Sequence, residues 1–169
     1  MDLNLVGLNH KTAPFEIREK FVFSHDMLSH VLKDLKLKTG AEAIILSTCN
    51  RTEIYFRVKD PNEIYQWLAT FNDIKFTELK KYLYTFSNQD CYVHACKVAS
   101  GLDSMLIGET QIFGQMKQAS QIANLSGVQG KYINTFFQDV FKTAKEVRSK
   151  TQIGSSATTI ASCALAIAK

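Results

Sequence analysis

A cysteine followed two residues later by an arginine is the first pattern in this sequence that could carry out chemistry. Cys49 ends the apolar run AEAIILST of residues 41–48, and Asn50, which tolerates turn conformations, follows it. A thiol at the end of a buried strand is accessible to substrates, and its thiolate is a nucleophile. If the backbone alternates across this corner, Arg51 shares a face with Cys49, where it would favour the thiolate and could bind a carboxylate.

Each candidate residue also has a structural interpretation. A lone cysteine at the end of a strand is more often structural than catalytic. His94 would be an acid or base if the fold brought it to Cys49, and is otherwise an ordinary core histidine. The basic residues Lys142, Lys145 and Arg148 fit a solvated helix face better than an RNA-binding patch. These alternatives stay open on the residue pattern alone.

Glutamines gather on one face of a helix expected near residues 110–125. An apolar face lies beside them, and the two sets are Gln111, Gln115, Gln118 and Gln121, and Ile112, Phe113, Met116 and Ile122. Gln111 and Gln115 could hold a polar ligand. Glu109 and the backbone N–H groups at the helix start could bind an amine and an anionic group respectively. An ordinary solvated helix is the alternative.

Composition excludes several classes of protein. The 169 residues are 46% hydrophobic, which is enough to bury a core. No run of about 18 apolar residues occurs, and the N-terminus lacks the pattern of a signal peptide, so we expect no membrane span and a cytoplasmic location. The formal net charge of +4 is compatible with a polyanionic partner but does not establish one.

Cysteine and glycine spacings argue against a metal site and a nucleotide-binding loop. The four cysteines form no C-x-x-C pair, so we expect reduced thiols. A zinc site built from Cys91, His94 and Cys96 would lack a fourth ligand, and we expect no metal. The glycines form no G-x-G-x-x-G pattern, so we expect no cofactor-binding residues in this chain.

Hydrophobic periodicity predicts four strands and five helices. The strands are expected over residues 2–9, 41–48, 52–58 and 81–86, and the helices after Ser24 and Asp60 and over residues 88–100, 110–125 and 131–150. Ser87 and Asp90 resemble a helix-capping pair. The third strand alternates strictly, with Arg51, Glu53, Tyr55 and Arg57 on the face that we expect to be exposed.

This element order predicts an α+β fold. The order β-α-β-β-α-β is that of a ferredoxin-like sandwich, with helices on one face of a mostly antiparallel sheet and additional C-terminal helices here. We expect residues 1–150 to form one domain. Residues 151–169 are small and apolar, and we expect them to begin a connecting helix that is cut short.

Four segments together resemble the glutamyl-tRNA reductases. They are GLNHKTAPFEIRE at 7–19, LSTCNRTEIY at 46–55, the helix that carries His94, and GLDSMLIGETQIFGQMKQA at 101–119. The resemblance covers nearly the whole chain and implies the N-terminal catalytic domain of that family. It implies that a cysteine attacks the ester of glutamyl-tRNA to form a thioester, which NADPH reduces to glutamate-1-semialdehyde for tetrapyrrole (porphyrin) synthesis.

The resemblance also implies which residues form the site. Cys49 matches the nucleophile and His94 a histidine important for activity. The residues implied to bind substrate are Thr48, Cys49, Asn50, Arg51, Ser104, Glu109, Thr110, Gln111 and Gln115, with Arg51 expected to hold the carboxylate of glutamate. Thr110 stands where bacterial members usually have proline, and His10 receives no role.

The same resemblance implies cofactor and partners. NADPH is expected to bind to a separate domain absent from this chain, and the full-length enzyme is expected to be a homodimer through a further helical domain. The chain would then form the acyl-enzyme, or hydrolyse glutamyl-tRNA slowly, without completing the reduction. Glutamate-1-semialdehyde aminomutase is the implied partner. The alternatives are a non-catalytic module that binds tRNA or a partner protein, and a cysteine hydrolase acting on small esters or amides.

Overall fold

The computed structural model describes residues 2–154 of the chain. Its strands are β1 (Asn4–Asn9), β2 (Glu42–Ser47), β3 (Arg51–Arg57) and β4 (Tyr84–Ser87). Its helices are α1 (Phe15–Arg18), α2 (His25–Thr39), α3 (Pro61–Phe71), α4 (Phe76–Leu79), α5 (Asn88–Ser100), α6 (Gln111–Leu125) and α7 (Lys131–Lys150). Beyond a short 3₁₀ turn at Gln152–Gly154, the connecting helix expected over 151–169 lies outside the described residues.

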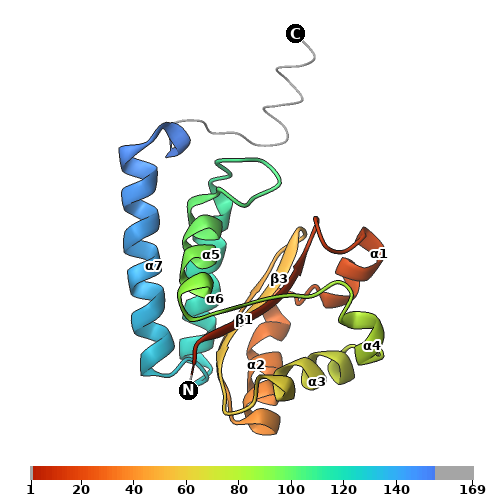
Figure 1. The fold of residues 1–169 in the computed structure, drawn as a ribbon. Helices are drawn as coiled ribbons and strands as arrows, with labels where there is room; N and C mark the ends of the chain where they lie inside the picture. Colours follow the sequence, from red (N-terminus) through yellow and green to blue (C-terminus); the bar gives the residue numbers. More distant parts are fainter. Residues whose placement is uncertain (1, 155–169) are drawn as a thin grey trace.

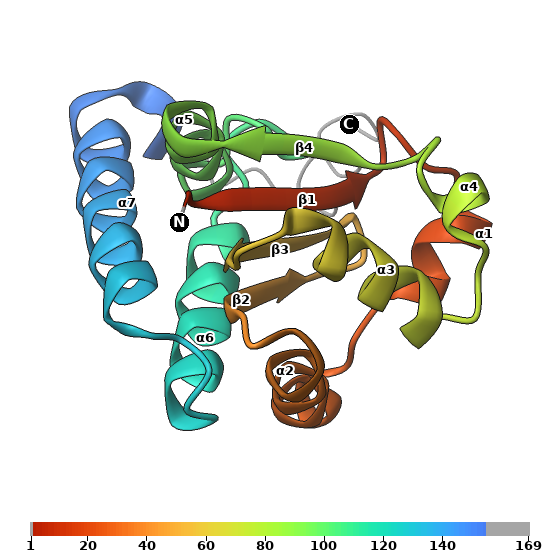
Figure 2. The ribbon, with the colours of Figure 1, turned by 60° about the horizontal axis from the view of Figure 1, so that its bottom comes forward.

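The four strands form one antiparallel sheet in the order β2-β3-β1-β4 (Figure 2). Ser47 pairs with Thr52 at the closed end of the β2–β3 hairpin, and Asn9 at the end of β1 pairs with Arg51. The main-chain N–H of His10 donates to the carbonyl of Asn50 over 3.0 Å. The register therefore brings the end of β1 beside the corner that carries Cys49.

Helices cover both faces of this sheet. Figure 1 shows α2 and α3 on one side and α5, α6 and α7 on the other. Neighbouring residues of β3 contact opposite layers: the ring of Tyr55 lies 5.1 Å from that of Phe137 on α7, and the ring of Phe56 lies 6.4 Å from that of Tyr65 on α3. The expectation that one face of β3 is exposed is therefore wrong, because the C-terminal helices form a second covering layer.

The element boundaries follow local sequence signals in most places. Asp60 caps α3 by accepting a hydrogen bond from the N–H of Asn62 over 3.0 Å, and Pro61 occupies the first turn. Two expectations were wrong. The fourth strand covers Tyr84–Ser87 instead of residues 81–86, and the side chain of Ser87 makes no capping hydrogen bond to α5.

The segment between α5 and α6 approaches the end of the sheet that carries Cys49. Helix α5 ends at Ser100 and is capped by Gly101, whose φ of 81° is a left-handed conformation that glycine adopts without strain. A Cβ atom at this position would lie 3.0 Å from the carbonyl oxygen of Glu109. The two ends of the 101–110 loop are therefore packed against each other. No helix within residues 2–154 is long and apolar enough to cross a membrane.

Candidate active site

A cavity of about 40 Å³ brings together residues from two separate segments of the chain. Its lining residues are Thr48, Cys49, Asn50, Arg51, Ser104, Met105, Glu109, Gln111, Ile112 and Gln115. Every substrate-binding residue expected from the sequence lines this cavity except Thr110. The first four come from the β2–β3 corner. The others come from the 101–110 loop and the start of α6, which are far from that corner in the sequence.

The corner between β2 and β3 presents Cys49 to solvent. The hydroxyl of Thr48 accepts hydrogen bonds from the main-chain N–H groups of Asn50 and Arg51, over 3.2 and 3.1 Å, which closes a tight turn around Cys49. From α1, Nη1 of Arg18 donates to the carbonyl oxygen of Cys49 over 2.9 Å. The main chain of the cysteine is therefore fixed on two sides while its side chain is exposed.

Arg51 is buried, and its guanidinium is held from two directions. Nη1 donates to Oε1 of Glu53 over 2.8 Å, and Nη2 donates to Oδ2 of Asp103 over 3.2 Å and also to the main-chain oxygen of Asp103. Burial alone would lower the pKa of Arg51, but the negative charge of Glu53 outweighs it and raises the pKa. A guanidinium has five N–H donors, so these three contacts do not exhaust its capacity to bind a carboxylate.

His94 does not line the cavity with Cys49. Its Nε2 lies 2.8 Å from Oε1 of Glu53, and its ring stacks on that of Phe86 with 4.7 Å between centroids. Glu53 is fully buried and lies between His94 and Arg51. Burial alone would raise the pKa of Glu53, but the hydrogen bond from His94 and the charge of Arg51 outweigh it and lower the pKa to about 2.

The 101–110 loop is tied to the rest of the domain at both ends. Nζ of Lys11 contacts Oδ1 of Asp103 at 2.5 Å, beside the contact of Asp103 with Arg51. Burial alone would raise the pKa of Asp103, but the hydrogen bond from Lys11 and the charge of Arg51 lower it. From α7, Nη1 of Arg148 donates to the carbonyl oxygens of Ser100 and Glu109 over 3.1 and 3.5 Å. Arg148 therefore does not belong to a solvated face, although Lys142 and Lys145 are exposed as expected.

Several residues around this site do not stand out in the sequence. Glu53 was expected on an exposed strand face, and Asp103 and Arg18 lie in segments whose roles depend on tertiary contacts. His10 received no role, yet its Nδ1 is buried without a hydrogen-bond partner among the described residues. Burial and the charge of Arg51 lower the pKa of His10, which places its side chain close to the same cluster.

Comparison with known proteins assigns the family. The family model described as "Glutamyl-tRNAGlu reductase, N-terminal domain" matches residues 6–151. The chain belongs to this family. It is 46% identical over 170 residues to the glutamyl-tRNA reductase of Thiobacillus denitrificans, covering 100% of this chain and 41% of the relative. It is also 45% identical over 170 residues to the glutamyl-tRNA reductase of Neisseria meningitidis serogroup C, covering 100% of this chain and 41% of that relative.

A solved structure of glutamyl-tRNA reductase from Methanopyrus kandleri has a similar fold over the matched region. The two structures superpose with a TM-score of 0.77 at 27% sequence identity, over 99% of this chain and 39% of the other. The chain thus spans about two fifths of the length of the glutamyl-tRNA reductases that it matches.

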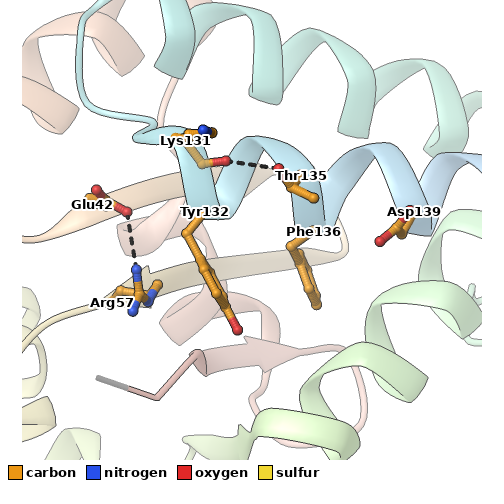
Figure 3. Close-up of a pocket in the computed structure, with 7 residues that line it drawn as sticks. All are labelled: Glu42, Arg57, Lys131, Tyr132, Thr135, Phe136 and Asp139. Atoms are coloured by element: carbon orange, nitrogen blue, oxygen red, sulfur yellow. Dashed lines mark hydrogen bonds and ion pairs between the residues drawn. The ribbon is translucent and has the colours of Figure 1, made fainter.

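A second, larger cavity lies at the opposite end of the β2–β3 hairpin from Cys49. It has a volume of about 480 Å³ and is lined by Glu42, Arg57, Lys131, Tyr132, Thr135, Phe136 and Asp139 (Figure 3). The guanidinium of Arg57 lies 3.9 Å from the ring centroid of Tyr132 and 3.9 Å from Oε2 of Glu42. None of the site residues expected from the glutamyl-tRNA reductase resemblance lines this cavity. Within residues 2–154, no group of three or more His, Cys, Asp or Glu side chains could hold a metal ion.

Proposed function

We propose that this domain removes glutamate from glutamyl-tRNA by forming a thioester on Cys49. The observation that carries this proposal is the single cavity that joins an exposed cysteine to Arg51 and to the polar residues of the 101–110 loop and α6. The relatives of the same family are named glutamyl-tRNA reductase. In the proposed step, the thiolate attacks the ester carbonyl, the bond from that carbon to the ribose oxygen breaks, and the tRNA hydroxyl leaves after taking up a proton.

The residues around Cys49 suit this acyl transfer. An aminoacyl ester is already activated, so a thiolate can displace the ribose oxygen without strong acid assistance. In our proposal Arg51 binds the side-chain carboxylate of glutamate, and Glu109 binds its ammonium group. Gln111 and Gln115 supply further polar contacts. The negative charge of Glu53 raises the pKa of Arg51 against the effect of burial, and this supports the part of Arg51 in the arrangement, because a permanently charged guanidinium binds a carboxylate most strongly.

The 101–110 loop has to move for a glutamyl group to enter. A cavity of about 40 Å³ has room for little more than one water molecule, whereas ligand sites have volumes of roughly 300–1,000 Å³. Ser104, Met105 and Glu109 form one side of the cavity and belong to this loop. We therefore propose that substrate binding displaces the loop away from the β2–β3 corner.

The later steps of the reaction are proposed to need parts beyond these 169 residues. The reduction of the thioester to glutamate-1-semialdehyde requires a hydride from NADPH, and this sequence has no G-x-G-x-x-G loop to bind it. We propose that NADPH binds to another part of the longer enzyme and that the full-length enzyme is a cytoplasmic homodimer. We also propose that glutamate-1-semialdehyde aminomutase receives the product.

We further propose that the sheet belongs to the ferredoxin-like class. The chain passes through β1, α2, β2, β3, α3 and β4 in turn, and the antiparallel sheet order β2-β3-β1-β4 is the one that a split β-α-β arrangement generates. Helices α5 to α7 would then be an added layer on the second face.

Mass spectrometry of the intact chain tests the acyl transfer. The chain is mixed with glutamyl-tRNA, quenched in acid and weighed, with Cys49→Ser as the control. We expect one glutamyl adduct on the wild-type chain, none on the variant, and no glutamate-1-semialdehyde when NADPH is added. If free glutamate appears but no adduct is seen at any quench time, the chain hydrolyses glutamyl-tRNA. If the chain releases glutamate from a small glutamate ester as fast as from glutamyl-tRNA, it is a general cysteine hydrolase. If Cys49→Ser behaves like the wild type, Cys49 is not the nucleophile.

A further inference from the structure

Glu53 collects four hydrogen-bond donors on one buried carboxylate. Nη1 of Arg51 and Nε2 of His94 both lie 2.8 Å from its Oε1. The hydroxyl of Tyr84 donates to Oε1 over 2.6 Å, and that of Tyr55 donates to Oε2 over 2.6 Å. The side chain of Glu53 has no solvent exposure, so its carboxylate is stabilised by these four donors and not by bulk water.

Arg51 and His94 meet at the same oxygen atom. A carboxylate that stays ionised can only accept hydrogen bonds, so Nε2 of His94 is a donor in this arrangement. His94 comes from α5, Tyr84 from β4 and Arg51 from β3. One atom of Glu53 therefore connects β4 and α5 to the guanidinium of Arg51, which lines the Cys49 cavity.

We propose that Glu53 is a positioning residue for Arg51, and that His94 affects the site through Glu53 instead of contacting the substrate. This proposal rests on the proposed function of the Cys49 cavity. Without the pull of Glu53, the guanidinium would be held only by Asp103 on its other side, and would turn towards the 101–110 loop. Its hydrogen-bonding edge would then no longer face the incoming carboxylate.

His94 is unsuited to a direct role in two respects. It is absent from the lining of the cavity, and its side chain is only 11% exposed. The rings of Phe86 and Tyr84 lie 4.7 and 5.5 Å from its own ring centroid, and together they direct its Nε2 at Glu53. The histidine is therefore held against the buried carboxylate and does not line the Cys49 cavity.

The strand beside Glu53 is shaped to admit this cluster. A Cβ atom on Gly7 of β1 would lie 2.9 Å from Cγ of Glu53 and 2.9 Å from Cζ of Tyr84. Glu53 is fully buried and Tyr84 is partly buried against the core, so at least one of the two side chains would have to shift. Gly7→Ala thus displaces the cluster without removing any of its polar groups. The variant therefore tests the position of these groups separately from their presence.

A double-mutant cycle tests the proposal in the complete 169-residue chain. Single-turnover formation of the Cys49 thioester is measured over a range of glutamyl-tRNA concentrations for Glu53→Gln, His94→Gln and the double variant. We expect each single variant to raise the half-saturating concentration by about tenfold or more, with a smaller change in the maximal rate. We also expect His94→Gln to add little in the Glu53→Gln background. His30→Gln, an exposed histidine on α2, is the matched control.

The outcome that overturns the proposal is an independent effect of His94. If His94→Gln lowers the maximal rate equally in both backgrounds, the histidine contacts the reacting groups. Gly7→Ala should also raise the half-saturating concentration of glutamyl-tRNA. If Gly7→Ala displaces the cluster and this concentration stays at the wild-type value, the positioning role of Glu53 is contradicted. If Glu53→Gln fails to fold, Gly7→Ala and Tyr84→Phe carry the same test.

NMR of the guanidinium group gives a readout that does not depend on acyl transfer. A guanidinium held by buried carboxylates gives separate Nη–H signals, whereas a rotating one gives averaged signals. We expect resolved signals for Arg51 in the wild-type chain and averaged ones in Glu53→Gln. Unchanged signals in the variant contradict the positioning role. A wild-type chain that forms no thioester contradicts the proposed function, and the NMR result still decides whether Glu53 holds Arg51.

Discussion

At the scale of single residues, the three cysteines of the described chain have very different surroundings. Cys49 is exposed at the tip of a turn, Cys91 is buried in α5, and Cys96 is half-buried on the same helix. Burial raises the pKa of Cys91 to about 12, and burial also raises that of Cys96. Since the thiolate is the reactive form, both burial and the raised pKa protect these two thiols from modification.

We therefore predict selective alkylation of Cys49. In the folded chain near neutral pH, iodoacetamide should modify Cys49 roughly a hundredfold faster than Cys91, because Cys49 is exposed whereas Cys91 is buried and has a raised pKa. Peptide mapping after a short reaction measures the two sites separately, and the same reaction in denaturant is the control that makes both thiols accessible. Equal labelling of Cys49 and Cys91 before unfolding would show that the packing around α5 is wrong.

Residue types and spacing identified only part of this site. Cys49 and Arg51 stand out because a thiol and a cation two residues apart suggest chemistry by themselves. Glu53 did not stand out, since a carboxylate in an alternating strand normally faces solvent. Its burial depends on Arg51, Tyr84 and His94 supplying donors from three elements, and no local pattern contains that information.

At the scale of elements, the C-terminal end of α7 holds the two ends of the 101–110 loop together. Arg148 reaches the carbonyl oxygens of Ser100 and Glu109, and the first of these lies at the end of α5. A cation at that position also interacts favourably with the negative end of the α5 dipole. The long helix thereby controls a loop that forms one side of the Cys49 cavity.

We predict that Arg148→Gln loosens this loop. The variant should lose about 1–3 kcal/mol of unfolding free energy, because two carbonyl oxygens lose a charged donor. The amide hydrogens of residues 102–110 should exchange with solvent faster than in the wild type, as measured by hydrogen exchange and mass spectrometry. Lys145→Gln removes the same charge from an exposed position on the same helix and should change neither quantity. Equal effects of the two substitutions would mean that charge, and not the contact, matters.

Periodicity predicted the elements well but not how they pack. The apolar stripe of α7 was visible in the sequence, and the helix covers Lys131–Lys150 as expected. The stripe does not specify its target, which is the Tyr55 side of β3. The alternation in β3 therefore assigned its residues correctly to two opposite faces of the strand, but the prediction that one face is exposed to solvent was wrong. Which helices cover each face depends on tertiary packing, which an alternating pattern in one strand cannot reveal.

At the scale of the whole molecule, several groups make stability depend on pH in the same direction. The pKa of Glu53 falls from 4.5 to about 2 on folding, where the donors of His94 and Arg51 outweigh burial. The pKa of Asp103 is lowered by Lys11 and Arg51 against the effect of burial, and that of Asp34 is lowered by its hydrogen bond from Trp67. Burial lowers the pKa of His10 from 6.5.

In each case the unfolded chain binds protons more readily than the folded one. The contribution of a carboxylate with a lowered pKa is complete above its unfolded pKa and is lost as the pH falls towards its folded pKa. For His10 the loss begins nearer pH 6.5, because the unfolded imidazole takes up a proton more readily than the partly buried ring of the folded chain. Stability should therefore decline gradually below about pH 6.5 and steeply below about pH 4.5.

We predict that Glu53→Gln removes much of the steep decline. The shift of Glu53 from 4.5 to about 2 corresponds to a free energy on the order of 3 kcal/mol, present at neutral pH and lost by about pH 2. Urea unfolding between pH 7 and pH 3 should show the variant less stable at pH 7 and the two curves converging as the pH falls. Asp26→Asn changes a fully exposed carboxylate and should run parallel to the wild type. A constant gap between the wild type and Glu53→Gln across this range would mean that Glu53 titrates normally in the folded chain, and the buried cluster around Arg51 could not then exist as described.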